Sequence, residues 1–545
     1  MKVNNQRNSL LIGLTLISVY GFQNCSQVKF QEPTSKSVSS SSVDVPLCRQ
    51  TSAPEVAPKL KWDWYAQLDK TNPDNFPDFS QVMATPMVAD LNGDGNSKVV
   101  FVSWTINSKL VDQQNINPLT GKIIGGYSTN GVLRIVNGKD GSTIKSVADL
   151  KLAPLGAASP ILVDLDGDGK IEIIYPHYLG RSVIALNSDG SLRWIYKTKY
   201  GVNNFRSFST ADLNGDGRAD IILGNEVISE DASGQPQQLF TLSSGSSVFQ
   251  FAHALDYTKP TEKRIIGKNG VFDNKGNKLF DLDPGLLYAA AEVDPSSPGI
   301  EIVGSGGGKI KIYDGIHGQL LKSVDLSPIS ELQCPKGVGG GAPTIGDFDG
   351  NPHTIEIAVA TGKYLTIFDQ NLNLIAKLET QDCSSEATGI SSFDFNGDGK
   401  PEILYGDEKY FRILELKRGQ LQVVSKIVNP SGTLLEYPVV VDLEGNGTSA
   451  IVVASNNYYL SYSGPSELQD LETARHVTGV RAFESTVAGS WMPTGKIWNQ
   501  YDFNPMLITE HGLPTSTPIV EGSYLTKIFR RNVQLALFEP KCSTQ

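Results

Sequence analysis

The sequence predicts an all-β chain folded as a β-propeller of eight four-stranded blades, with seven blades as the alternative. Three observations predict it. A short aspartate-rich motif recurs, starting at residues 90, 164, 212, 256, 294, 347, 394 and 442. Each copy is followed by short runs rich in β-branched and aromatic residues with turn signals between them. A segment ahead of the first copy also resembles the last strand of a repeat unit. The count of seven applies if the copy at Asp256 is not a blade.

The second copy gives the clearest repeat unit. A first strand precedes the motif, two strands follow it, and an Asp189-Gly190 turn leads to a fourth strand. The expected strands are 160–163, 171–176, 182–187 and 192–197. A single sheet of four short strands buries its faces only against copies of itself, so serial units predict a ring of blades.

The segment Lys59–Trp64 is expected to close this ring. Its sequence, Lys-Leu-Lys-Trp-Asp-Trp, resembles the fourth strand at 191–196, which reads Ser-Leu-Arg-Trp-Ile-Tyr. Because it precedes the first repeat, we expect it to form the outer strand of the last blade. Such closure leaves no free sheet edge.

The aspartate motif has the spacing of a cation-binding loop. The copy at 164–172 places carboxylates at positions 1, 3, 5 and 9 and a glycine at position 6. Calcium takes about six to eight oxygen ligands, and a tight glycine-containing loop can turn alternate side chains and the position-7 carbonyl toward one point. The predicted ligands of the three complete loops are Asp164, Asp166, Asp168, Lys170 and Glu172; Asp212, Asn214, Asp216, Arg218 and Asp220; and Asp394, Asn396, Asp398, Lys400 and Glu402.

A fourth loop is nearly complete. It offers Asp90, Asn92, Asp94 and Asn96 but has Lys98 where the ninth-position acid would stand. The sequence therefore predicts three to four calcium sites. The copies at 256, 294, 347 and 442 depart from the pattern and leave metal binding open, and a set of Asp/Asn/Gly turns without metal is the alternative for all loops.

The spacing excludes an EF-hand. That loop needs a bidentate Glu at position 12 and a helix on each side. Position 12 here is Phe101, Tyr175, Leu223 or Tyr405, and the flanking residues favour strands.

In the setting Pro86–Gly95, these loops resemble FG-GAP/VCBS repeats, the blades of integrin-α-type β-propellers. The resemblance covers about residues 59–500 and implies that loop positions 1, 3, 5 and 9 bind calcium. The segments 491–501 and 529–532 resemble a tail found after such repeats in bacterial surface proteins. We expect residues 501–545 to be an extension packed on the propeller, with Trp491 and Trp498 against the last blade. A sugar-stacking platform is the alternative for these tryptophans.

The N-terminal residues are typical of an exported protein. Residues 1–24 have basic residues ahead of a short apolar core, as in a secretory signal. The segment ending at Cys25 resembles a bacterial lipobox, which implies lipidation of Cys25. Residues 25–58 are rich in serine and proline and predict a flexible tether. We expect an outer-membrane lipoprotein of the cell envelope that contacts the membrane only through its lipid; a secreted protein without the lipid is the alternative.

Four further cysteines predict two disulfide bonds in an oxidising compartment. Cys334 and Cys383 lie at matching points of adjacent repeats, and Cys48 and Cys542 lie at the two ends of the mature chain. We expect the pairs Cys334–Cys383 and Cys48–Cys542, although three pairings are possible.

The net charge of the chain and its motifs narrow the range of possible functions. A net charge of −11 argues against a nucleic-acid-binding surface. No nucleophile–base constellation is evident. The first hypothesis is therefore a non-catalytic, calcium-stabilised surface module for adhesion that binds a protein or glycan. The alternatives are a propeller enzyme, such as a polysaccharide lyase, with chemistry at the central funnel, and an architectural part of an envelope complex.

Overall fold

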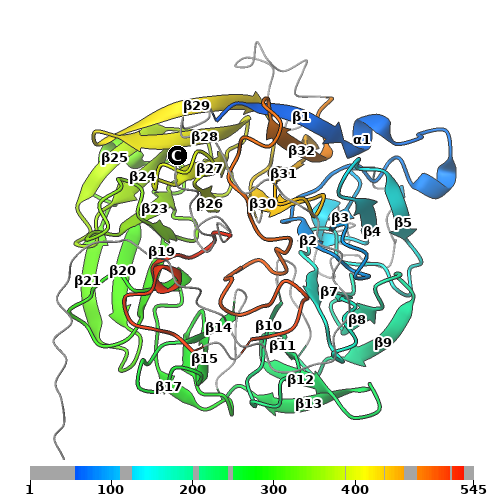
Figure 1. The fold of residues 1–545 in the computed structure, drawn as a ribbon, viewed down its shortest axis with the longest axis horizontal. Helices are drawn as coiled ribbons and strands as arrows, with labels where there is room; N and C mark the ends of the chain where they lie inside the picture. Colours follow the sequence, from blue (N-terminus) through cyan, green and yellow to red (C-terminus); the bar gives the residue numbers. More distant parts are fainter. Residues whose placement is uncertain are drawn as a thin grey trace, which may run out of the picture.

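A computed structural model describes residues 56–107, 109–110, 126–200, 208–243, 250–386, 388–434, 436–458, 476–515 and 518–532. These residues form eight four-stranded antiparallel sheets around a central axis (Figure 1). The fold is a β-propeller, and the prediction of eight blades is confirmed. The copy at Asp256 belongs to a true blade, which rules out seven.

The first four blades follow the chain without interruption. In each, the first strand lies nearest the axis and the fourth lies on the rim (Figure 1). Blade 1 is β2 (Met87–Ala89), β3 (Lys98–Ser103), β4 (Val132–Asn137) and β5 (Thr143–Val147); blade 2 is β6 (Ile161–Val163), β7 (Glu172–Pro176), β8 (Ser182–Leu186) and β9 (Leu192–Lys197); blade 3 is β10 (Ser209–Ala211), β11 (Asp220–Ile222), β12 (Glu226–Glu230) and β13 (Pro236–Thr241); blade 4 is β14 (Phe251–Ala254), β15 (Lys263–Gly267), β16 (Gly270–Phe272) and β17 (Lys278–Phe280).

The next three blades repeat this order, and the last one borrows a strand from the N-terminal end. Blade 5 is β18 (Leu287–Ala291), β19 (Glu301–Gly306), β20 (Lys309–Asp314) and β21 (Leu320–Asp325); blade 6 is β22 (Thr344–Gly346), β23 (Glu356–Ala360), β24 (Tyr364–Phe368) and β25 (Leu374–Glu379); blade 7 is β26 (Ile390–Phe393), β27 (Glu402–Gly406), β28 (Tyr410–Lys417) and β29 (Gln420–Val428); blade 8 is β30 (Val439–Asp442), β31 (Ser449–Ser455), β32 (Gly479–Ser485) and β1 (Pro58–Asp63). Short helices of three or four residues occur at α1 (Trp64–Gln67), η1 (Pro73–Asn75), η2 (Gly126–Ser128), η3 (Ser330–Leu332) and η6 (Tyr524–Lys527).

The closing strand lies where the sequence predicts it. β1 pairs antiparallel with β32, with Lys59 opposite Glu484 and Trp62 opposite Ala482. The indole Nε1 of Trp62 donates to the carbonyl of Gly138 in blade 1 at 2.8 Å, so the same strand also joins the neighbouring blade. β1 therefore closes the ring and covers what would otherwise be an exposed sheet edge.

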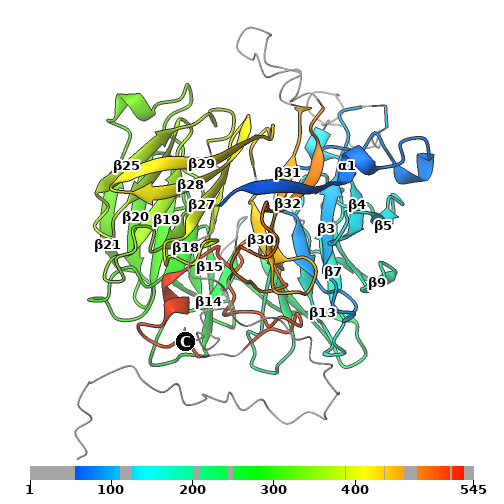
Figure 2. The same cartoon turned by 45° about the horizontal axis from the view of Figure 1, so that its top comes forward.

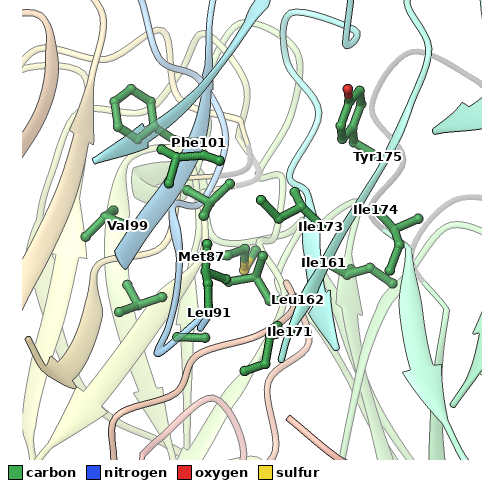
Figure 3. Packing of buried hydrophobic residues seen from close by; sticks show 14 of the residues in the cluster. Met87, Leu91, Val99, Phe101, Ile161, Leu162, Ile171, Ile173, Ile174 and Tyr175 are labelled. Carbon is green, nitrogen blue, oxygen red and sulfur yellow. The ribbon is translucent and has the colours of Figure 1, made fainter. Parts of the chain in front are cut away.

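Apolar side chains fill the space between successive blades. Figure 3 shows Met87 and Leu91 of blade 1 beside Leu162 and Ile171 of blade 2, all within one buried cluster. The amide of Ile171 also donates to the carbonyl of Leu91 at 2.8 Å. Each blade thus depends on its neighbours for burial, as in other repeat architectures.

A C-terminal segment crosses the centre of the ring, and we call it the strap. It comprises the described part of residues 491–532, drawn in orange and red in Figures 1 and 2. β32 ends at Ser485, so the segment that packs on the propeller includes residues on both sides of the boundary placed after residue 500. Strap residues form hydrogen bonds or β-bridges with every blade. These contacts pair, from blade 1 to blade 8, Trp498 with Val88, Asn499 with Leu162, Gln500 with Thr210, Asn504 with His253, Thr526 with Glu292, Phe529 with Ile345, Met492 with Phe395, and Gly495 with Asp442.

Residues from the two ends of the strap also contact each other. The amide Nδ2 of Asn532 donates to the carbonyl of Ile497 at 3.1 Å and to Val440 of blade 8 at 3.0 Å. A buried ion pair joins Arg530 and Asp502, both in the strap. The strap is therefore a second closure of the ring, inside the one made by β1.

The two tryptophans of the tail motif are both fully buried. Trp491 packs on Phe395 of blade 7 with ring centroids 4.6 Å apart. Trp498 pairs with the first blade through Val88, rather than with the last blade, and stacks on Phe503. Their burial leaves no exposed ring face for a sugar.

The disulfide Cys334–Cys383 is present, as predicted. It joins the segments that precede blades 6 and 7. Cys25, Cys48 and Cys542 lie outside the described residues, so lipidation and the second disulfide stay predictions, as do the signal segment 1–24 and nearly all of the tether 25–58. Among the residues that the structure covers, no helix is long and apolar enough to cross a membrane.

Candidate metal centres

The aspartate loops join the first and second strands of each blade. In blade 2, the carboxylate of Asp164 accepts hydrogen bonds from the amides of Gly167 at 2.7 Å and Gly169 at 2.9 Å. Both glycines have a left-handed backbone, with φ of 77° and 82°, which residues with a Cβ rarely adopt. Asp212 and Asp394 accept from the equivalent glycines. Position 1 therefore shapes the loop through its own backbone.

Position 9 is the first residue of the second strand. In blades 2, 3 and 7, one oxygen of this buried carboxylate accepts from the amide of the apolar residue at position 2. The pairs are Glu172 with Leu165, Asp220 with Leu213, and Glu402 with Phe395, at 2.8–2.9 Å. The other oxygen is left for a further partner.

The loop of blade 2 brings three predicted ligands together. Oxygens of Asp164, Asp166 and Glu172 all lie within 4.8 Å of one another. The carboxylate of Asp168 is exposed and accepts from the amide of Lys170 at 2.7 Å. The structure therefore groups positions 1, 3 and 9 and leaves position 5 at the solvent side.

In blade 3, one oxygen of the ninth-position carboxylate has no hydrogen-bond partner among the described residues. This oxygen is Oδ1 of Asp220, which is fully buried. Burial, together with the charges of Asp216 and Asp212, raises the pKa of Asp220 to about 7 against the opposing hydrogen bond from Leu213. An unpaired buried carboxylate oxygen is costly, and a bound cation would satisfy it. The residues present thus fit a metal ion.

The side chains at positions 3 and 5 of this loop accept hydrogen bonds from backbone amides of the same loop. The amide of Asp216 donates to Asn214 Oδ1 at 2.9 Å, and the amide of Arg218 donates to Asp216 Oδ1 at 2.9 Å. The blade 7 loop repeats these contacts through Asn396, Asp398 and Lys400.

The blade 7 loop differs at the second oxygen of its ninth-position carboxylate, which has a hydrogen-bond partner. There, Asn396 Nδ2 donates to Glu402 Oε1 at 2.8 Å. Burial holds the pKa of Glu402 well above its ordinary value. The equivalent carboxylate in blade 2, Glu172, has its pKa raised to about 8 by burial and by Asp166 and Asp164, against Leu165 and Arg193. Negative charge is thus disfavoured at both positions until a cation is near.

Arg193 is a member of the blade 2 site that the motif did not reveal. It lies on the rim strand β9, and its Nη2 donates to Asp166 Oδ2 at 2.8 Å while its Nε donates to Glu230 at 2.6 Å. Lys61, at the matching place on the closing strand, bonds Glu444 in the loop of blade 8. The parallel between the two strand sequences is the signal that could have found Arg193.

The loop of blade 1 surrounds a cation of the protein itself. The carboxylate of Asp90 accepts from the amides of Asp94 and Gly95. Asn92, Asp94 and Asn96 all face the ammonium group of Lys98. The four residues predicted as ligands are therefore together, with a lysine among them.

Three of the four departing loops, those of blades 5, 6 and 8, fall into two kinds. In blade 6, oxygens of Asp347, Asp349 and Glu356 lie within 4.8 Å of one another, a grouping that the spacing had left open. In blades 5 and 8, a lysine bonds the loop: Lys322 contacts Asp294 at 2.9 Å, and Lys61 contacts Glu444.

The donor set of these loops is made of oxygens only. Carboxylates, amide oxygens and carbonyls suit hard cations such as calcium rather than zinc or iron. Residues 164–223, which hold the loops of blades 2 and 3, match the family described as the FG-GAP-like repeat.

FG-GAP-like repeats are commonly calcium-binding, and the acidic cluster of blade 2 lies inside the matched segment. No curated protein sequence is similar enough to this chain to match it.

Solved structures share the fold. The crystal structure of the V. cholerae biofilm matrix protein Bap1 is similar with a TM-score of 0.67 and 19% sequence identity, over 87% of this chain and 98% of that chain. The rhamnogalacturonan lyase YesW is less similar, with a TM-score of 0.48 and 16% identity over 75% of this chain and 72% of that chain. At this identity, the likeness to Bap1 shows the propeller fold.

Proposed function

We propose that this protein is a calcium-stabilised β-propeller that serves as a non-catalytic binding module for a protein or glycan at the cell surface. The observation that carries the proposal is the strap. It contacts all eight blades at the axis, where a propeller enzyme would place its chemistry. The faces and rim of the ring remain for a partner.

Calcium has a structural role in this proposal. The loops of blades 2, 3 and 7 would each hold one ion through positions 1, 3, 5 and 9 and the position-7 carbonyl. Asp164, Asp166 and Glu172 lie close enough to share a cation, and the unmet oxygen of Asp220 supports the same assignment in blade 3. The ion would offset both the burial of Glu172 and the repulsion from Asp166 and Asp164, which together raise its pKa.

Two considerations support a surface role. The N-terminal segment resembles a lipoprotein signal ending at Cys25, which would tether the propeller to the outer membrane. The fold is also similar to that of a protein described as a biofilm matrix protein.

The experiment uses the chain from residue 56 to residue 545, immobilised and exposed to a glycan array and to a solubilised envelope fraction in calcium. We expect retention of a polysaccharide or an envelope protein without any change in its covalent structure. Cleavage of the retained polysaccharide would replace this proposal with the lyase alternative. Either a failure of radiolabelled palmitate to enter the full chain, or equal labelling of the full chain and of Cys25→Ala, would remove the lipid anchor from the proposal.

A further inference from the structure

Position 9 of the blade 1 loop is a lysine. In the sheet register, the first residue of each second strand pairs with the last residue of the first strand, and Lys98 pairs with Ala89 in this way. The equivalent residues in blades 2 to 7 are Glu172, Asp220, Lys263, Glu301, Glu356 and Glu402. In blade 8, where the pairing extends one residue further to Asp442, the equivalent residue is Ala450 opposite Val441. A cation in the protein chain therefore stands where three predicted calcium loops have an acid.

The ammonium group of Lys98 points into the loop. Its Nζ donates to Asn92 Oδ1 at 2.7 Å, to Asp94 Oδ1 at 2.7 Å and to the carbonyl of Asn96 at 2.8 Å. Asp90 Oδ1 lies 3.9 Å away. These acceptors are positions 3, 5, 7 and 1, the same positions that would coordinate an ion in the complete loops.

We infer that the ammonium of Lys98 occupies the ion position of the blade 1 loop, which is therefore complete without metal and does not bind calcium. The ammonium donates three hydrogen bonds there, the full number that it can make. The side chain is 12% exposed, so its charge is partly shielded from water. A calcium ion could enter only by displacing this group and leaving it beside a divalent charge.

The blade 1 loop lies where the ring closes, and this position explains the advantage of a lysine at position 9. Blade 1 meets blade 8 where the ring closes, and Ser97, next to Lys98, donates to the carbonyl of Asp442 at 2.8 Å. In the blade 8 loop, Lys61 of the closing strand bonds Glu444. Lysine side chains thus bond the loops of both blades at the ring closure. This part of the ring therefore keeps its geometry when calcium is scarce.

The test counts calcium ions bound per molecule by equilibrium dialysis on the chain from residue 56. We expect Lys98→Glu, which restores the ninth-position acid, to bind one ion more than the unaltered protein. Lys139→Glu makes the same change of charge at an exposed turn of blade 1 and is expected to leave the count unchanged. A folded Lys98→Glu protein with no additional ion would overturn the inference.

A second variant decides the matter if Lys98→Glu does not fold. Asp90→Asn removes the position-1 charge and is expected to leave the calcium count of the protein unchanged; a count lower by one would show that the loop already binds an ion and would overturn the inference. The result is separate from the proposed function: if the unaltered protein bound no calcium at all, that proposal would fail, while a single ion gained by Lys98→Glu would still support the role of Lys98.

Discussion

Glu172 uses its two carboxylate oxygens differently. Oε2 accepts from the amide of Leu165 and fixes the loop, while Oε1 lies 3.8 Å from Nη1 of Arg193. The spacing of acids predicted which residues would gather, because the loop is local in sequence. The spacing could not predict Arg193, because that contact depends on how the rim strand folds back over the loop.

Replacing Glu172 by Gln separates the two roles. Without calcium, the variant is expected to be as stable as the unaltered protein or more stable at pH 7, because it removes a carboxylate whose pKa is raised to about 8. With calcium, it is expected to lose the stabilisation from one site. Thermal melting with and without calcium measures both effects. Glu226→Gln, a buried change outside the loops, is the control; equal calcium responses in both variants would contradict the assignment.

His253 forms a buried contact between blade 4 and the strap. Its Nδ1 bonds the carbonyl of Ala254 at 2.6 Å, and its Nε2 accepts from Asn504 Nδ2 at 2.9 Å, which requires the neutral imidazole. Burial, together with the charge of Lys263, lowers the pKa of His253 to about 4 against the opposing hydrogen bond to Ala254.

Acid is therefore expected to weaken this contact. The unfolded chain binds the proton from about pH 6.5 downward and the folded chain only from about pH 4, so stability falls as pH falls between these values, by about 3 kcal/mol in all. His253→Gln, which does not titrate, is expected to show a flatter decline in chemical denaturation between pH 7 and pH 4. The exposed His511→Gln is the control. Identical pH profiles for all three proteins would contradict this.

At the scale of elements, strands were more predictable than the strap. The four strands expected in blade 2 lie within one residue of those observed, because alternating burial and Gly-containing turns mark them locally. The strap has no such period. Many of its contacts are main-chain hydrogen bonds, such as that from Leu162 to the carbonyl of Asn499, which almost any residue can make. Its route around the axis could not be predicted from the sequence.

Removing β1 tests ring closure. A chain starting at residue 64 leaves the edge of β32 without its partner, and we expect it to self-associate through that edge and to melt at a lower temperature. A chain starting at residue 56 retains β1 and is the matched control. Size-exclusion chromatography with light scattering distinguishes them, and two equally monomeric, equally stable proteins would show that β1 is dispensable.

At the scale of the whole molecule, the stabilisation from an ion bound in one loop extends to all eight blades. Each blade is buried against its neighbours, so an ion bound in one loop stabilises the ring as a unit. Sequence repeats predicted the number of blades even where the motif at Asp256 is worn, because the strands around it keep their spacing.

Calcium is expected to raise the melting temperature of the whole propeller. Each occupied site contributes about 2.7 kcal/mol when calcium is at a hundredfold excess over its dissociation constant. Differential scanning calorimetry in calcium, in EGTA and in magnesium measures this, with magnesium as the control because it prefers a smaller, octahedral site. A melting temperature indifferent to EGTA would exclude the structural role.

The pairing of β1 with β32 constrains the order of assembly during synthesis. Lys61 finds its partner Glu484 only 423 residues later in the chain. The first strand to leave the ribosome is thus among the last to be placed, and a contact so distant in sequence is slow to form. The ring therefore cannot be closed by this strand until nearly the whole chain has been synthesised.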